Sequence, residues 1–197
     1  MTHKKTNKLI PFSWFGGKAS HLKWLLPLLP IKGITEFVDL FGGSASVLLN
    51  RPPVPVETYN DLDGRLVNFF QVLREQPENL IQQLLLTPVS RREFECARKS
   101  FEAPTLDSLV EQARKFYILA RQSYANTGPG GGSGWRFVVN DDSNRVVLTW
   151  WSGIERLRAV ADRFSRVQLE NRSGLRLIEL HDRPGVLIYI DPPYLEV

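Results

Sequence analysis

The sequence predicts an α/β protein whose sheet is interrupted by a long helical segment. Residues 34–50 have the pattern of a strand, a glycine turn and a helix, and residues 57–75 repeat the strand and the helix. Helical spacing then continues from residue 78 to residue 123 without a strand pattern. A continuous apolar run at residues 185–190 predicts one more buried strand near the end of the sequence.

The composition is that of a globular protein without a disulfide scaffold. The chain has 197 residues, of which 43% are hydrophobic and 23% are charged, enough for one sizeable core. The single cysteine, Cys96, and the scattered His3, His21 and His181 argue against a metal site and favour a reducing cytoplasm. No apolar run approaches the roughly twenty residues that span a bilayer, so we expect no membrane insertion. The net charge of +4 mildly favours a polyanionic partner.

The first predicted strand, residues 34–40, ends at a glycine turn. The turn has the sequence Phe41-Gly42-Gly43-Ser44-Ala45-Ser46, and the helical residues 47–50 follow it. Glycines let a ligand approach the backbone closely, and the start of the following helix offers free N–H groups. The turn therefore predicts a ligand site. Asp39, taken without further context, is a turn residue.

The second predicted strand, residues 57–61, ends in Asp61, and residues 62–75 carry a helical apolar spacing. An acid about twenty residues beyond a glycine turn is where nucleotide-binding α/β folds bind a pair of ribose hydroxyls. Asp61 fits this position. The turn lacks the G-x-G-x-x-G pattern of dinucleotide enzymes, which counts against a nicotinamide cofactor.

Residues 76–150 differ in character and predict an inserted, mainly helical lobe. Helical patterns at 78–86, 90–101 and 106–123 carry many positive charges, and a glycine-rich loop follows at 126–136. The loop either becomes ordered on a ligand or is a flexible linker without contacts. We expect a hairpin at residues 138–149. The residues expected to bind phosphates are Arg91, Arg92, Arg98, Arg121 and Arg136.

The α/β character returns in residues 151–197, with a helix at 152–164 and strands at 167–170 and 185–190. The last strand leads into Asp191-Pro192-Pro193-Tyr194. Two consecutive prolines fix φ twice and remove two backbone donors, which leaves an acceptor-rich cup beside an aromatic ring. The Asp191 carboxylate and the Pro192 carbonyl can hold the two hydrogens of an exocyclic amine, while Tyr194 stacks on the base. A capped strand end with a Pro-Pro turn explains these residues equally well.

Four segments in this order resemble the Dam-like DNA adenine-N6 methyltransferases of phage and prophage type. They are Pro11-Phe12-Ser13-Trp14-Phe15-Gly16-Gly17-Lys18, Phe37-Val38-Asp39-Leu40-Phe41-Gly42-Gly43-Ser44, Tyr59-Asn60-Asp61-Leu62-Asp63 and Asp191-Pro192-Pro193-Tyr194. The resemblance implies a Rossmann-like sheet in which residues 1–75 bind S-adenosylmethionine. It also implies that residues 76–150 recognise double-stranded DNA and that residues 151–197 end at the catalytic motif. The implied reaction transfers a methyl group to N6 of a flipped-out adenine, without a metal.

The resemblance also assigns roles to single residues. It implies a cofactor pocket made of Trp14, Lys18, Asp39, Phe41, Gly42, Asp61 and Asp191. It implies that the chemistry is carried out by Asp191, Pro192, Pro193 and Tyr194. Without the resemblance, Trp14 is more often a core residue, and Lys18 can be the solvated start of a helix.

The family continues past the catalytic segment with strands and helices that complete the sheet, whereas Leu195-Glu196-Val197 follow it here. We therefore expect the C-terminal part of the sheet to be missing, an exposed sheet edge that needs a partner, and weak or absent activity. One alternative is a catalytically silent remnant that binds DNA or cofactor without turnover. Another alternative changes the acceptor to cytosine N4 or to an RNA or protein amide.

Overall fold

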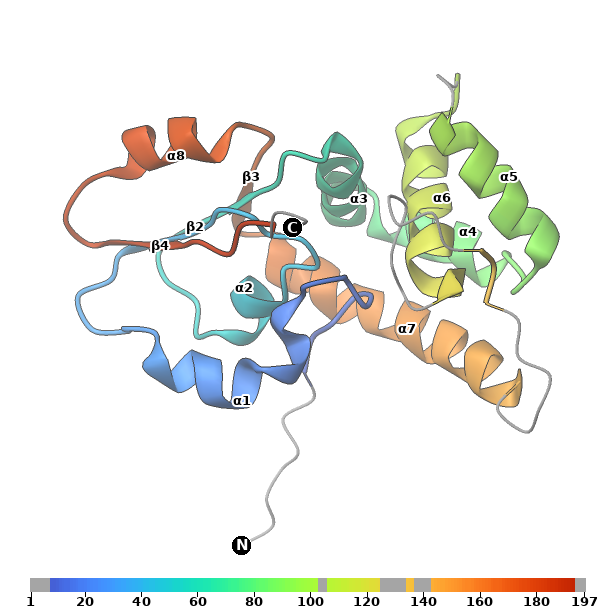
Figure 1. Ribbon diagram of the computed structural model, residues 1–197, viewed down its shortest axis with the longest axis horizontal. Coiled ribbons are helices and arrows are strands. Elements are labelled where there is room, and N and C mark those ends of the chain that lie inside the picture. The colour runs from blue at the N-terminus through green and yellow to red at the C-terminus, as the bar shows by residue number, and fades with distance from the viewer. Residues whose placement is uncertain (1–7, 103–105, 125–133, 137–142, 194–197) are drawn as a thin grey trace, which may run out of the picture.

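The computed structural model describes residues 8–102, 106–124, 134–136 and 143–193. The described part contains a four-stranded sheet with helices on both faces (Figure 1). The predicted α/β class is therefore confirmed. Tyr194 and most of the glycine-rich loop lie outside the described residues.

All four strands of the sheet are parallel. They are β1 (Glu36–Asp39), β2 (Val56–Asn60), β3 (Val167–Glu170) and β4 (Val186–Tyr189), in the order β3-β2-β1-β4. Asp39, at the end of β1, is in register with both Tyr59 of β2 and Tyr189 of β4. Because parallel strands share a direction, the segments that follow these three strands meet at one edge of the sheet. β4 forms one end of the sheet and its residues are half-buried.

The two faces of the sheet are covered by different helices. On one face, Val38 and Leu40 pack against Leu177 of α8 (Gly174–His181). On the other face, Phe37 and Tyr59 join the main core with α2 (Ser46–Asn50), α3 (Gly64–Glu75) and α7 (Ser143–Phe164). β4 is apolar at every position, because its side chains pack alternately against the two clusters on the two faces of the sheet.

The helical segment between α3 and α7 lies to one side of the sheet (Figure 1). It contains α4 (Pro77–Leu85), α5 (Arg91–Glu102) and α6 (Leu109–Gln122). The side chain of Ser108 caps α6 by accepting a hydrogen bond from the Glu111 amide at 3.2 Å. α6 packs on α3, where the rings of Phe69 and Tyr117 stack with centroids 5.7 Å apart. The helical segment thus shares one continuous core with the sheet, and the predicted domain boundaries stay a prediction.

Short elements near the N-terminus lie beside α2. They are a 3-10 turn at Lys18–Ser20, α1 (Leu22–Leu25) and a second 3-10 turn at Leu26–Leu28. The Asn50 side chain fastens the preceding segment, because it bonds both the amide and the carbonyl of Leu9 at 2.9 Å. Further along this segment, the ring of Trp14 lies beside Gly43, in the turn that follows β1.

The hairpin predicted at residues 138–149 is wrong, because α7 begins at Ser143 and runs unbroken to Phe164. Positions 138–142 lie outside the described residues. β-branched residues and tryptophans at 146–151 suggested a strand from local propensity. Their spacing decides otherwise: Val146, Trp150, Ile154, Leu157 and Phe164 all fall on one buried helical face.

The stack of Phe164 on Phe70 is central to the core, with ring centroids 4.3 Å apart. Because Phe164 is fully buried, we expect Phe164→Ala to lower the free energy of unfolding by about 3–5 kcal/mol. Urea denaturation followed by circular dichroism measures this loss. Leu175→Ala, at a position that is 76% exposed on α8, is the control and should change stability little. Equal effects of the two substitutions would contradict this account of the core.

Candidate cofactor and catalytic site

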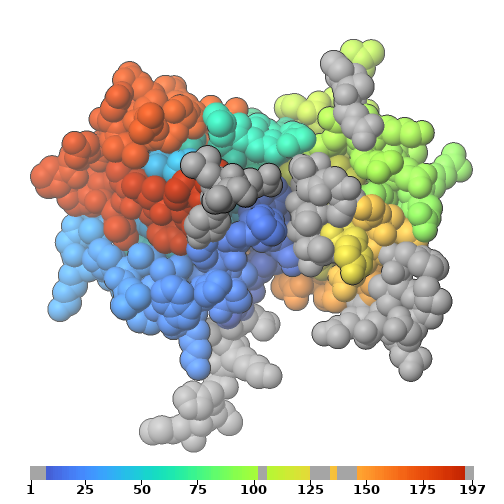
Figure 2. All heavy atoms as spheres, in the orientation of Figure 1, coloured from blue at the N-terminus to red at the C-terminus, as the bar shows by residue number. Residues whose placement is uncertain are grey.

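A cleft of about 460 Å³ opens where the strands end. Four segments of the chain line it, namely residues 14–18, residues 39–47 in part, residues 61–62 and residues 189–193 in part. The N-terminal segment (blue) and the C-terminal strand (red) meet on this face of the molecule (Figure 2). All residues of the expected cofactor pocket line the cleft: Trp14, Lys18, Asp39, Phe41, Gly42, Asp61 and Asp191.

The glycine turn after β1 requires its glycines for packing. A Cβ on Gly42 would lie 2.1 Å from Cε2 of Tyr59, and a Cβ on Gly43 would lie 2.8 Å from Cδ1 of Trp14. Gly43 also has φ +50°, in the left-handed region that glycine adopts readily. Ala45, at the N-cap of α2, has φ 55°. The glycines therefore let protein side chains clamp the turn from two sides, whereas the sequence had suggested close approach of a ligand.

Asp61, directly after β2, is held in one orientation by two backbone amides. Its Oδ2 accepts from the Gly43 amide at 3.0 Å, and its Oδ1 accepts from the Asp63 amide at 2.9 Å. Burial raises the pKa of Asp61, while these amides lower it in part. Each carboxylate oxygen has a further lone pair for a hydroxyl donor, which suits the role expected from the sequence.

Asp39, at the end of β1, is almost completely buried, with 2% of its surface exposed. Burial raises the pKa of Asp39 to about 8, a hydrogen bond from the Leu48 amide lowers it, and the neighbouring charges of Asp191 and Asp61 raise it. The raised pKa therefore favours the protonated form of Asp39 at neutral pH. A cation bound in the cleft would favour its ionised form.

Asp191, which follows β4, forms an ion pair with Lys18. Lys18 Nζ lies 2.5 Å from Asp191 Oδ2 and also donates to the Gly16 carbonyl at 2.8 Å. Each side chain is 20% exposed. The pair joins the N-terminal segment to the strand end that carries Pro192 and Pro193. Tyr194, the remaining member of the expected catalytic set, lies outside the described residues.

Trp14 belongs both to the core and to the cleft. Its ring meets Phe12 edge-on with centroids 5.9 Å apart and lies 6.2 Å from the ring of Phe116 on α6. Trp14 thus packs against the core and also lines the cleft, and its contact with a cofactor stays a prediction. Phe41, on the opposite side, packs against the α8 cluster.

Several residues that line the cleft were not among the predicted site residues, and Phe15, Leu62 and Tyr189 have the largest side chains of these. Phe15 is 79% exposed and Leu62 is 72% exposed, which is unusual for large apolar side chains. Phe15 and Leu62 lie inside two of the quoted segments and Tyr189 lies in the predicted last strand, and that position was the available signal.

The basic residues expected to meet DNA lie outside the cleft. Arg91, Arg92 and Arg98 are exposed on α5, and the Arg91 guanidinium lies over the Trp135 ring at 4.8 Å. The Arg136 amide donates to the Gln122 carbonyl at 2.8 Å. Arg121 Nη2 donates a hydrogen bond to the Thr149 carbonyl of α7, so this guanidinium binds a group of the protein itself.

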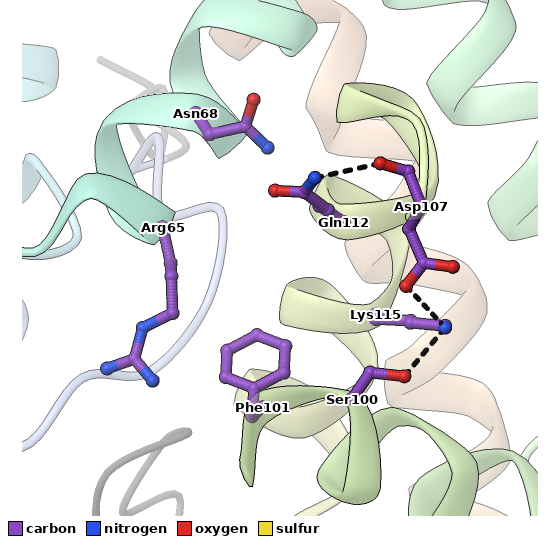
Figure 3. Close-up of a pocket in the computed structure, with 7 residues that line it drawn as sticks. All are labelled: Arg65, Asn68, Ser100, Phe101, Asp107, Gln112 and Lys115. Carbon is purple, nitrogen blue, oxygen red and sulfur yellow. Dashed lines mark hydrogen bonds and ion pairs between the residues drawn. The ribbon is translucent and has the colours of Figure 1, made fainter. Parts of the chain in front are cut away.

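A second hollow of about 180 Å³ lies between α3, α5 and α6 (Figure 3). Its cations are already paired. Lys115 Nζ lies 2.7 Å from both Asp107 Oδ2 and Ser100 Oγ, and Arg65, which borders Phe101, is bonded to Asp63 at 2.7 Å. Because its charged groups satisfy each other, this hollow has weaker ligand chemistry than the cleft at the strand ends.

Two further findings concern the described residues as a whole. They contain no group of three or more His, Cys, Asp or Glu side chains that could hold a metal ion. None of their helices combines the length and the apolar character that crossing a bilayer requires.

The raised pKa of Asp39 predicts a pH dependence of stability. Between pH 3.8 and about 8, Asp39 binds up to one proton more in the folded protein than in the unfolded chain, so through this group rising pH destabilises the fold across this window. Asp39→Asn should remove a slope of up to about 1.4 kcal/mol per pH unit. Urea unfolding at several pH values between 5 and 7.5 measures it. The control, Asp182→Asn at an exposed position, should keep the wild-type slope. Parallel profiles of wild type and Asp39→Asn would contradict the prediction.

Comparison with known proteins adds an independent finding to this geometry. Residues 14–197 match the family described as D12 class N6 adenine-specific DNA methyltransferase. The modification methylase StsI of Streptococcus sanguinis is 39% identical over 77 residues, which are 38% of this chain and 11% of that protein. The aligned part thus spans about a tenth of that relative. Because the family match extends over nearly all of the sequence, the chain belongs to the D12 class of N6 adenine-specific DNA methyltransferases.

Proposed function

We propose that the cleft at the strand ends transfers the methyl group of S-adenosylmethionine to N6 of an adenine in double-stranded DNA. The observation that carries the proposal is the convergence of the N-terminal segment, the glycine turn, Asp61 and Asp191 in one cleft. Family membership supports the adenine acceptor over cytosine, RNA or protein amides, and it does not favour the binding-only alternative. The expectation that the C-terminal part of the sheet is missing stays a prediction.

The residues present fit the proposed cofactor. The cleft volume of about 460 Å³ lies in the range of small-molecule sites. Asp61, oriented by two amides, would accept hydrogen bonds from the ribose hydroxyls. Asp39 would lie toward the methionine end of the cofactor. A positive charge bound there would favour the ionised form of Asp39, whose pKa is raised by burial. When bound, this cofactor supplies an electrophilic methyl group on a sulfonium.

Asp191 and the Pro192 carbonyl would hold the two hydrogens of the adenine amine. Lys18 Nζ now lies against Asp191 Oδ2, so the amine would take the place of the ammonium on that oxygen. The nitrogen lone pair is then aligned with the methyl group, and Asp191 stabilises the positive charge that develops on the amine. Tyr194 would stack on the base.

The target adenine would have to leave the duplex to reach this cleft. Asp191 is only 20% exposed at its side chain, and a base inside a stacked helix presents its amine within the groove. Unstacking costs a few kcal/mol, which contacts in the cleft and to phosphates would offset. Exposed arginines on α5 are suited to these phosphate contacts.

The experiment that tests the proposal measures N6-methyladenine in DNA by nucleoside mass spectrometry, after incubation with S-adenosylmethionine. We expect product with the wild-type chain at the weak level expected from the sequence, and at least a ~100-fold loss with Asp191→Ala, because the amine loses its acceptor. Asp162→Ala, at an exposed position on α7, is the matched control and should keep activity. Absence of N6-methyladenine with the wild type, or equal activity of Asp191→Ala, would overturn the proposal.

Phosphate contacts from α5 predict a specific salt dependence of DNA binding. Each phosphate contact contributes a slope of about 0.9 to the plot of log affinity against log salt concentration. We expect Arg92→Ala to weaken binding and to reduce the slope by about this amount, as measured by fluorescence anisotropy. Arg176→Ala serves as the control, because Arg176 is exposed on α8 and pairs with Glu179 at 2.9 Å. An unchanged slope in Arg92→Ala would exclude this residue from the DNA contact.

A further inference from the structure

Tyr59, the fourth residue of β2, lies directly beneath the glycine turn. It is fully buried, and its Oη donates a hydrogen bond of 2.8 Å to the carbonyl of Gly43. Its ring fills the space that a side chain at position 42 would need. Tyr59 does not line the cleft, so any effect it has on a ligand must pass through the turn.

The two residues after Tyr59 bind the same turn. The carbonyl of Asn60 accepts from the Gly42 amide at 2.8 Å, and its side-chain amide donates to the Leu40 carbonyl at 2.9 Å. Asp61 Oδ2 accepts from the Gly43 amide at 3.0 Å. Consecutive residues at the end of β2 thus hold successive peptide groups after β1. Among these residues, Tyr59 is the one whose hydrogen bond holds the carbonyl of Gly43.

The position of Tyr59 is itself fixed by the aromatic core. Its ring centroid lies 4.8 Å from that of Phe70 and 5.6 Å from that of Phe164. A rigid donor therefore faces a flexible acceptor, since Gly43 has no Cβ and its peptide groups can rotate at little steric cost. Rotation of the Gly43 carbonyl away from Tyr59 would leave a buried hydroxyl without a partner.

We propose that Tyr59 is a positioning residue that sets the glycine turn in the orientation that binds S-adenosylmethionine. The inference rests on the proposed function, and it concerns cofactor affinity rather than the methyl-transfer step. A turn that is held before binding loses less conformational entropy when the ligand arrives, which strengthens binding. Tyr59 would therefore lower the dissociation constant of the cofactor without touching it.

The test compares two buried tyrosines that differ in the partner of the hydroxyl. Tyr117 is also fully buried, but its Oη has no hydrogen-bond partner in the described part of the chain. We expect Tyr59→Phe to weaken S-adenosylmethionine binding about 3- to 10-fold by isothermal titration calorimetry, and Tyr117→Phe to leave it unchanged. The KM for the cofactor should rise in Tyr59→Phe while the KM for DNA stays constant.

A further variant separates the donor from the shape of the ring. With 4-aminophenylalanine at position 59, which keeps the ring and replaces the hydroxyl by another donor, cofactor affinity should return toward that of the wild type. Equal affinity of wild type and Tyr59→Phe, or equal losses in Tyr59→Phe and Tyr117→Phe, would overturn the inference. A Tyr59→Phe protein that does not fold would also overturn it, because the hydroxyl would then serve the fold as a whole.

Amide hydrogen exchange separates this inference from the proposed function. Tyr59→Phe should speed exchange at the Gly42, Gly43 and Ala45 amides several-fold, with no change at the amides of α6. If the wild type fails to bind S-adenosylmethionine, the proposed function falls, and exchange alone then decides the role of Tyr59. Unchanged exchange at the turn would contradict that role.

Discussion

The pairing of β1 with both β2 and β4, in parallel and in register, is the constraint on which the site depends. Asp39 is opposite Tyr59 on one side and Tyr189 on the other. Because of this register, the glycine turn, Asp61 and Asp191 leave the sheet at the same level, although they are far apart in the sequence. A shift of one residue in either pairing would turn each side chain to the opposite face and separate these groups.

The electrostatics of the cleft differ from those of the whole chain. The protein carries a net charge of +4, yet Asp39, Asp61 and Asp191 all line the cleft, with Lys18 bound to one of them. Burial makes this arrangement costly, and it is relieved by the proton on Asp39 and by the amides that hold Asp61. An acidic cleft within a basic protein suits a cationic small molecule inside and a polyanion outside, in agreement with the proposed function.

Local patterns predicted a helix or strand wherever the propensities of its residues and the spacing of its buried positions indicated the same structure. Several patterns were recognisable, since each extends over a few neighbouring residues: the apolar runs of β1 and β4, the glycine turn, and the short strand pattern of β2 that ends in an acid. The beginning of α7 was not recognisable, because β-branched and aromatic residues from Val146 to Trp151 favour a strand by propensity. The burial of Val146 and Trp150 on the helical face that α7 turns toward α3 and α4 overrides that preference.

The sequence by itself determined which chemical groups line the cleft: the acids after the strands, the Pro-Pro segment, Trp14 and Lys18. Only the tertiary structure decided what these groups do to each other. The ion pair of Lys18 with Asp191, the proton on Asp39 and the clamp of Tyr59 and Trp14 on the glycine turn all depend on contacts between distant segments. Such contacts follow from the packing of the sheet and its helices, and residue spacing along the chain does not encode them.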